Sequence, residues 1–290
     1  MKTKRNHAFT LIELLVVITI IAILASLAVP AFTMVQTQGN QMKGVNNCKQ
    51  IILSLKQFSK DNNSSYPDSI LNPLTGGVAN TSNDAFRFLV QEQIVTDERI
   101  FGCPAGYNTM DNNSLGAAPS FGQALLPGEN HWAMTAGQTD TTQGNMPMVF
   151  ENPVTQGWPP QWNADAAGQI KPGRTWPGGK IIIGRNDGSV AVEALNGKRG
   201  TVGPKQMAGG MDTFTQASQG QPQRVLNIIL AGGAMGGSYT DPSGGLPPAP
   251  LGQPGLPGGL GQPLPGGLPG APPAPLGQPG GLPPSPLGNP

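Results

Sequence analysis

One long apolar segment near the N-terminus constrains this chain more than any other feature of its sequence. Residues 9–29 form a run of 21 residues in which Glu13 is the only charged side chain. An α-helix rises about 1.5 Å per residue, so such a run spans the roughly 30 Å hydrocarbon core of a bilayer. Lys2, Lys4 and Arg5 precede the run. Because basic residues tend to stay on the cytoplasmic side, we expect a single-pass membrane protein with a cytoplasmic N-terminus and an extracytoplasmic body.

Glu13 distinguishes this segment from an ordinary secretory signal or a simple signal anchor, which needs no such carboxylate. A charged group within the membrane is costly, so it usually has a partner and a function. The sequence offers no basic residue between Glu13 and Met42. We therefore expect the neutralising cation to come from another molecule or from a free amino terminus.

Residues 8–18, Ala-Phe-Thr-Leu-Ile-Glu-Leu-Leu-Val-Val-Ile, closely resemble the class III signal of type IV prepilins and type II secretion pseudopilins. In that family a membrane aspartyl protease cuts after a small residue, normally Gly, and methylates the new amino group, normally on Phe. The resemblance implies a leader at residues 1–8, cleavage between Ala8 and Phe9, and N-methylation of Phe9. It makes Glu13 the fifth mature residue, where the family keeps a glutamate. Ala8 departs from the usual Gly, but the change is the smallest available and we expect cleavage to survive it.

The resemblance also implies a function: a structural pilin or pseudopilin subunit in the inner membrane that becomes a cell-surface filament when assembled. Its implied partners are a prepilin peptidase, an inner-membrane assembly platform, membrane lipid and other subunits in a homo-oligomeric filament. The Phe9 ammonium of an incoming subunit would meet the Glu13 carboxylate of an assembled one, so that both charges are neutralised at low dielectric. A heterologous contact that repeats without closing produces a filament.

The apolar run is expected to continue as one long helix over residues 9–61, with residues 9–29 in the membrane. Pro30 predicts a kink or a local opening. Gly39 and Gly44 each weaken a helix by about 1 kcal/mol relative to Ala, which predicts a pliable middle. Apolar residues at three- and four-residue spacing predict that the second half packs on a head; they are Val35, Met42, Val45, Cys48, Ile52, Leu55 and Phe58.

The predicted fold class is α+β and pilin-like, with the long helix packed on a small antiparallel-sheet head at residues 62–241. Within the head, residues 85–95 read as a short helix, and residues 147–151 and 180–185 as strands. Asn-Asp-Gly at residues 186–188 predicts a tight turn into a second hairpin strand at residues 189–194.

Residues 46–51, 101–104 and 177–190 together resemble pilin-like proteins with a His-X9-Asp-Gly signature, common in planctomycete and verrucomicrobial genomes. Pro177 stands at the His position, so any role of that His is absent here. We interpret the remaining Asp187 and Gly188 as hairpin residues rather than a chemical site.

Cysteine and histidine usage argues against a metal site. Cys48 and Cys103 are far apart and lie in no CxxC or His-spaced pattern. The sequence leaves two alternatives for this pair, a single disulfide between them or two free thiols. His7 belongs to the leader, which leaves His131 as the only mature histidine. A His-based metal site or catalytic triad is therefore not expected, and His131 is interpreted as structural.

Four acidic residues could contribute to a calcium-binding loop, but they show no Asp-x-Asp-x-Gly spacing: Asp111, Glu129, Asp140 and Asp165. We expect no metal, no cofactor and no enzymatic activity, since no nucleophile-base pair or phosphate loop is recognisable. Net charge is +1 and no basic run exceeds a pair, so nucleic acid is not an expected partner.

Residues 242–290 contain no charged side chain and consist mostly of Gly, Pro, Leu, Ala and Gln. A nine-residue motif recurs within them, at residues 247–255 and 272–280. Such composition predicts a disordered, partly polyproline II tail. A surface spacer, a partner-binding strand and a tolerated extension all remain open for it.

Two functions from different classes fit the sequence. The first is a filament subunit of a type IV pilus or of a type II secretion pseudopilus, which the sequence does not distinguish. The alternative is a pilin-anchored bitopic envelope protein whose head binds a ligand or partner without forming a filament.

Overall fold

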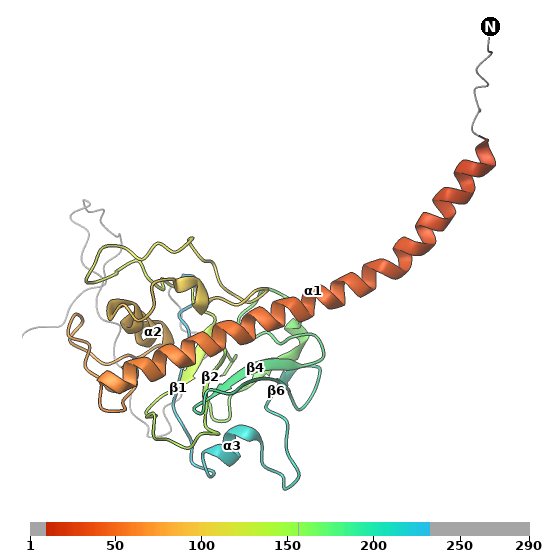
Figure 1. The fold of residues 1–290 in the computed structure, drawn as a ribbon. Helices are drawn as coiled ribbons and strands as arrows, with labels where there is room; N and C mark the ends of the chain where they lie inside the picture. Colours follow the sequence, from red (N-terminus) through yellow and green to blue (C-terminus); the bar gives the residue numbers. More distant parts are fainter. Residues whose placement is uncertain (1–9, 156, 233–290) are drawn as a thin grey trace, which may run out of the picture. The chain divides into compact units, whose positions relative to one another are not determined.

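The computed structural model describes residues 10–155 and 157–232 (Figure 1). The leader, the cleavage site at Ala8 and Phe9, and the Pro/Gly-rich tail at 242–290 lie outside the described residues.

A single helix of 51 residues, α1 (Leu11–Asp61), dominates the fold. Residues 11–36 are exposed along their whole length, whereas the second half packs on the head. The predicted end near Asp61 is confirmed, because Asn62 caps the helix and Asn63 and Ser64 take positive φ values of 51° and 63°. The buried residues of this second half are Gly44, Cys48, Ile51, Ile52, Leu55, Phe58 and Ser59.

The head is built on a five-stranded antiparallel sheet in the order β5-β4-β2-β1-β7. Its strands are β1 (Trp132–Thr135), β2 (Pro147–Glu151), β4 (Lys180–Arg185), β5 (Val190–Ala194) and β7 (Val225–Leu226). The predicted strands at 147–151 and 180–185 and the β4-β5 hairpin are therefore confirmed. A smaller sheet pairs β3 (Trp162–Asn163) with β6 (Thr201–Val202).

Short helices lie between α1 and β1 and in two of the later connections. They are α2 (Ser82–Gln91), α3 (Thr213–Ala217) and the 3₁₀ turns η1 (Pro67–Ser69), η2 (Glu98–Phe101) and η3 (Ala164–Ala166). The helix predicted at residues 85–95 exists, but it lies three to four residues earlier, at Ser82–Gln91. α2 begins earlier because Thr81 and Asp84 form a capping box, and it ends before Gln93, whose φ is +55°.

The sheet separates two apolar clusters. Ile182 of β4 packs toward α1 with Cys48, Leu55 and Phe58, while its neighbours Ile181 and Ile183 pack on the other face with Phe150, Trp162 and Phe214. Successive residues of a strand point to opposite faces, so one strand supplies both layers. The predicted long helix on an antiparallel head is confirmed.

Two glycines allow α1 to lie close against β4. A Cβ added at Gly44 would lie 2.6 Å from Ile182 Cδ1 and 3.0 Å from Cys103 Sγ. On the facing strand, a Cβ at Gly184 would lie 2.3 Å from Ile52 Cδ1 and 2.7 Å from Cys48 Sγ. Gly44 is therefore a packing residue, which corrects its interpretation as a point of pliability. At Gly39 nothing lies within 4 Å of an added Cβ.

This difference predicts opposite effects for the same substitution. Gly39→Ala should stabilise the chain by about 1 kcal/mol, because Ala favours a helix and meets no neighbour there. Gly44→Ala should be destabilising, because overpacking a dense core costs about 1–3 kcal/mol and outweighs that gain. Denaturant unfolding of the full chain in detergent measures both; equal stabilisation by the two variants would contradict the packing role of Gly44.

Candidate functional site

The exposed first half of α1 is the part of the described chain that fits a membrane. Among the described residues, α1 is the one helix long and apolar enough to cross a bilayer, and its apolar window is not buried by the head. Its polar side chains satisfy themselves on the helix: Thr19 Oγ1 donates to Leu15 O at 2.7 Å and Ser26 Oγ to Ile23 O at 2.7 Å. Lipid offers no hydrogen-bond partners, so such internal pairing suits this environment. Glu13 remains the one charged group on residues 11–36.

Glu13 forms a capping box with Thr10 at the start of α1. Its Oε2 accepts hydrogen bonds from Thr10 N at 2.9 Å and from Thr10 Oγ1 at 2.7 Å. In return, Glu13 N donates to Thr10 Oγ1 at 3.3 Å. Sequence reasoning missed this role of Thr10, although the Thr-x-x-Glu spacing is a recognised capping signal. Both of these donors are neutral groups of Thr10, so they do not neutralise the negative charge of the Glu13 carboxylate.

Pro30 lies inside α1, which continues through it without a break. Pro30 lacks an N–H, so the carbonyl of Ser26 loses its usual helical donor. Thr33 Oγ1 donates to Pro30 O at 2.8 Å on the following turn. The helix is curved in Figure 1, and it runs unbroken from Leu11 to Asp61, so it does not open at Pro30. The predicted kink stays a prediction.

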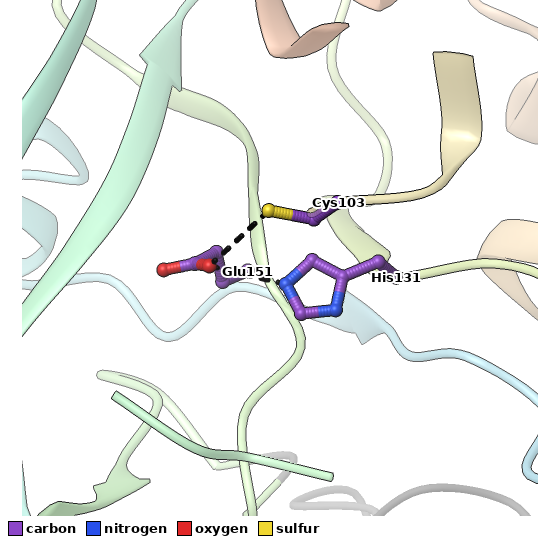
Figure 2. A group of neighbouring side chains, drawn as sticks. All are labelled: Cys103, His131 and Glu151. Atoms are coloured by element: carbon purple, nitrogen blue, oxygen red, sulfur yellow. Dashed lines mark hydrogen bonds and ion pairs between the residues drawn. The ribbon is translucent and has the colours of Figure 1, made fainter. Parts of the chain in front are cut away.

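A buried polar cluster lies beneath α1 (Figure 2). Cys103 follows η2, His131 directly precedes β1, and Glu151 ends β2. Their ligand atoms lie within 4.8 Å of one another. Glu151 Oε1 lies 3.1 Å from His131 Nε2 and 3.2 Å from Arg174 Nη2, and Glu151 Oε2 accepts from Ile182 N at 3.0 Å. Sequence reasoning missed Glu151 and Arg174, which lie beside His131 although they are remote from it along the chain.

The charges of this cluster favour an ion-pair network over a metal site. The Arg174 guanidinium already bonds the carboxylate oxygen that a metal would use, and its Nη2 lies 3.8 Å from Cys103 Sγ. A second cation there would be repelled in a low-dielectric interior. Burial lowers the pKa of His131 and raises the pKa of the Cys103 thiol, so both are held neutral. Arg174 also stacks on Trp176, 4.0 Å from the ring centroid. The interpretation of His131 as a structural residue fits this geometry.

Cys48 and Cys103 are free, buried thiols in the structure, so the disulfide considered from the sequence is not formed in it. Cys48 Sγ donates to Val149 O at 3.6 Å, and Cys103 Sγ lies 3.9 Å from Glu151 Oε1. Each sulfur therefore has a different neighbour in the core. Burial raises the pKa of Cys48 as well, which makes its thiol a packing group rather than a nucleophile.

Asp187 and Gly188 lie in the β4-β5 turn, where Gly188 has a φ of +84° and Arg185 N donates to Ser189 O at 2.8 Å. Asp187 Oδ1 accepts from Ser189 N at 2.7 Å. The adjacent Asn186 ties this turn to the rest of the head: its Oδ1 accepts from Tyr66 Oη at 2.7 Å. Pro177 is an exposed residue of the turn before β4. This geometry agrees with a hairpin role.

The four acidic residues that could have formed a calcium-binding loop do not meet at one place. Asp140 pairs with Lys56, and Asp165 lies in η3. Asp111 and Glu129 interact with each other and with Glu98, a buried carboxyl that sequence reasoning did not single out.

Two comparisons with known proteins give a match, one for the N-terminal segment and one for a longer part of the chain. The family model of the prokaryotic N-terminal methylation motif matches residues 3–29. A curated relative, the type IV major pilin protein PilA of Myxococcus xanthus (strain DK1622), is 28% identical over 203 residues, covering 58% of this chain and 84% of the relative. No solved structure matches the chain at a significant level.

The buried network predicts that Arg174 matters for stability. Arg174→Met leaves Glu151 buried without its cation, and removing one partner of such a pair costs about 3–5 kcal/mol. Arg99→Met is the matched control, because it breaks an exposed pair with Asp97 and should change stability little. Denaturant unfolding of the full chain in detergent measures both, and equal effects of the two variants would contradict a buried ion pair.

Proposed function

We infer from the N-terminal methylation motif and the pilin homologue that this chain is a member of the prepilin family and a structural pilin or pseudopilin subunit. The observation that carries the inference is the first half of α1: an exposed apolar helix, matched by the methylation motif, whose single charge is Glu13. The pilin family is structural, and we propose that this chain has no enzymatic activity.

Processing at the leader is the first step of the proposal. A prepilin peptidase cuts between Ala8 and Phe9 and the amino group of Phe9 is methylated. Cleavage removes the basic residues of the leader and leaves an ammonium group at the end of an apolar helix. The N-terminus faces the cytoplasm before cleavage, and the head lies in the periplasm or outside the cell.

In the proposed assembly step, the Glu13 carboxylate changes its hydrogen-bond partner from Thr10 to the Phe9 ammonium of another subunit. Among the described residues, Thr10 alone bonds this carboxylate, and both bonds come from neutral donors. The Phe9 ammonium of an incoming subunit offers a charged donor, and charge-assisted hydrogen bonds are roughly twice as strong as neutral ones. Phe9 and Glu13 are four residues apart, so pairing them across subunits implies an axial stagger of at least roughly 6 Å. The repeated contact gives a helical filament.

A type IV pilus is the better of the two filament assignments, because the relative covered over most of its length is a type IV major pilin. In this proposal the inner-membrane assembly platform and membrane lipid hold the subunit before it enters the filament. The bitopic alternative, a head that binds a ligand without assembly, predicts the same anchor but no role for Glu13 between subunits.

Processing is tested by the intact mass of the membrane form. We expect a chain that begins at Phe9 and carries one N-methyl group. Ala8→Gly should leave processing intact or speed it. A mature chain that retains Met1, or that begins beyond Ala25, would contradict the proposal.

Assembly is tested at Glu13 in cells that make no other pilin. Glu13→Val should abolish filaments while the monomer accumulates in the membrane, because the incoming ammonium loses its partner. Glu13→Gln should be intermediate, since the amide still accepts from Thr10 but carries no charge. Thr19→Val is the control, because Thr19 bonds only its own helix.

The readout is the amount of the chain in filaments sheared from the cells relative to the membrane fraction. Wild-type filament levels with Glu13→Val would assign Glu13 to processing or to the assembly machinery instead.

A further inference from the structure

Basic side chains gather at one edge of the head, around the start of β4. Lys180 begins β4, and Lys198 and Arg199 lie in the loop between β5 and β6. The two segments touch, because Leu195 N donates to Gly179 O at 2.7 Å and a Cβ added at Gly179 would lie 3.5 Å from Lys198 Cα. All three cations are exposed.

Lys171 extends this edge. It lies in the loop after η3, and β3 joins that loop to β6, since Asn163 N donates to Gly173 O at 2.8 Å and Asn163 pairs with Thr201. Among the described residues, the basic side chains of this edge form no ion pair and donate no hydrogen bond. Asp165 of η3 is an exposed carboxylate nearby, so the edge keeps an excess of positive charge.

The same edge lies toward the membrane segment. A Cβ added at Gly44 would lie 2.6 Å from Ile182 Cδ1, and one added at Gly184 would lie 2.7 Å from Cys48 Sγ, so β4 and α1 run side by side in the same direction. Lys180, at the start of β4, therefore lies on the side from which the exposed half of α1 leaves the head. In Figure 1, β6 lies on that side too.

Lys43 on α1 relates this edge to the bilayer. Phe32, Met34 and Val35 are apolar and exposed, so α1 can contact lipid as far as Val35. From position 35 to position 43 a helix rises about 12 Å. A headgroup layer is roughly 5–7 Å thick and charges act over a Debye length of about 8 Å, so cations at this level reach the lipid phosphates. We call the cations of this edge the basic patch: Lys43, Lys171, Lys180, Lys198 and Arg199.

We propose that the basic patch holds the head of the unassembled subunit against anionic phospholipid headgroups of the membrane that α1 spans. Each Lys or Arg near an anionic surface strengthens such binding by about fivefold, so the patch as a whole fixes the orientation of the head. Entry into a filament would release this contact. The proposal rests on the part of the proposed function that places α1 in a membrane, and it does not depend on filament assembly.

The test measures lysine acetylation by peptide mass spectrometry on the full chain in nanodiscs of phosphatidylcholine, with and without phosphatidylglycerol. With phosphatidylglycerol, Lys180 and Lys198 should react at least about threefold more slowly, because the anionic surface concentrates protons about threefold and headgroups cover the amines. Lys60, in the last turn of α1 and outside the patch, is the internal control and should keep its rate. About 1 M NaCl should remove the difference, since it shortens the Debye length to about 3 Å.

Two charge-matched variants separate the basic patch from the net charge of the head. Lys198→Gln combined with Arg199→Gln should restore the reactivity of Lys180 in phosphatidylglycerol nanodiscs. Lys60→Gln combined with Arg224→Gln removes the same charge from exposed positions outside the patch, and it should leave Lys180 protected.

Three outcomes would overturn the proposal. Equal Lys180 rates in the two lipid mixtures, or equal protection in both variants, would overturn it alone. Protection of Lys180 by inorganic phosphate in phosphatidylcholine nanodiscs would assign the patch to a soluble anion instead of lipid. A chain that does not enter nanodiscs would overturn the membrane anchor of the proposed function together with this proposal.

Discussion

The close packing of α1 against β4 is the contact on which the rest of the structure depends. Gly44 and Gly184 leave no room for a side chain between the helix and the strand. This close approach leaves Ile52, Leu55 and Phe58 almost fully buried. Burial of each of these side chains stabilises the fold by about 1.5–3 kcal/mol. The second half of α1 is thereby fixed to the head, and the first half is free to meet lipid or other subunits.

The chain treats its internal charges in two different ways. Glu151 is neutralised inside the head by Arg174, with His131 as a third partner. Glu13 has only the neutral donors of Thr10 within the described residues. Because no cation neutralises Glu13 within the described residues, its carboxylate can pair with a cation of another subunit during assembly. On this contrast rests the proposal that the buried cluster is structural and that Glu13 acts in assembly.

The sequence predicted those features of the fold that depend on residues close together in the chain. The end of α1 at Asp61, the strands at 147–151 and 180–185, and the hairpin at Gly188 all follow from periodicity and turn chemistry. The start of α2 was misplaced because the capping box at Thr81 was overlooked. The same kind of spacing at Thr10 was also missed.

Contacts between distant segments could not be read from the sequence. Glu151 and Arg174 meet Cys103 and His131 only because β1, β2 and the loop before β4 converge, and no spacing encodes that convergence. Gly44 looked like a weak point of a helix because its neighbours Ile182 and Cys103 come from remote parts of the chain. Glu98 was passed over for the same reason, since its partners lie at residues 111–129.

In the proposed filament, the exposed α1 segments of many copies pack together. Electron cryomicroscopy of filaments sheared from cells that produce this chain as their sole pilin tests that packing. We expect a helical map in which residues 11–36 of neighbouring subunits form the central bundle, with each Glu13 carboxylate next to the Phe9 amino group of another subunit. Filaments that lack the chain, with all of it left as monomer in the membrane, would rule out this assembly.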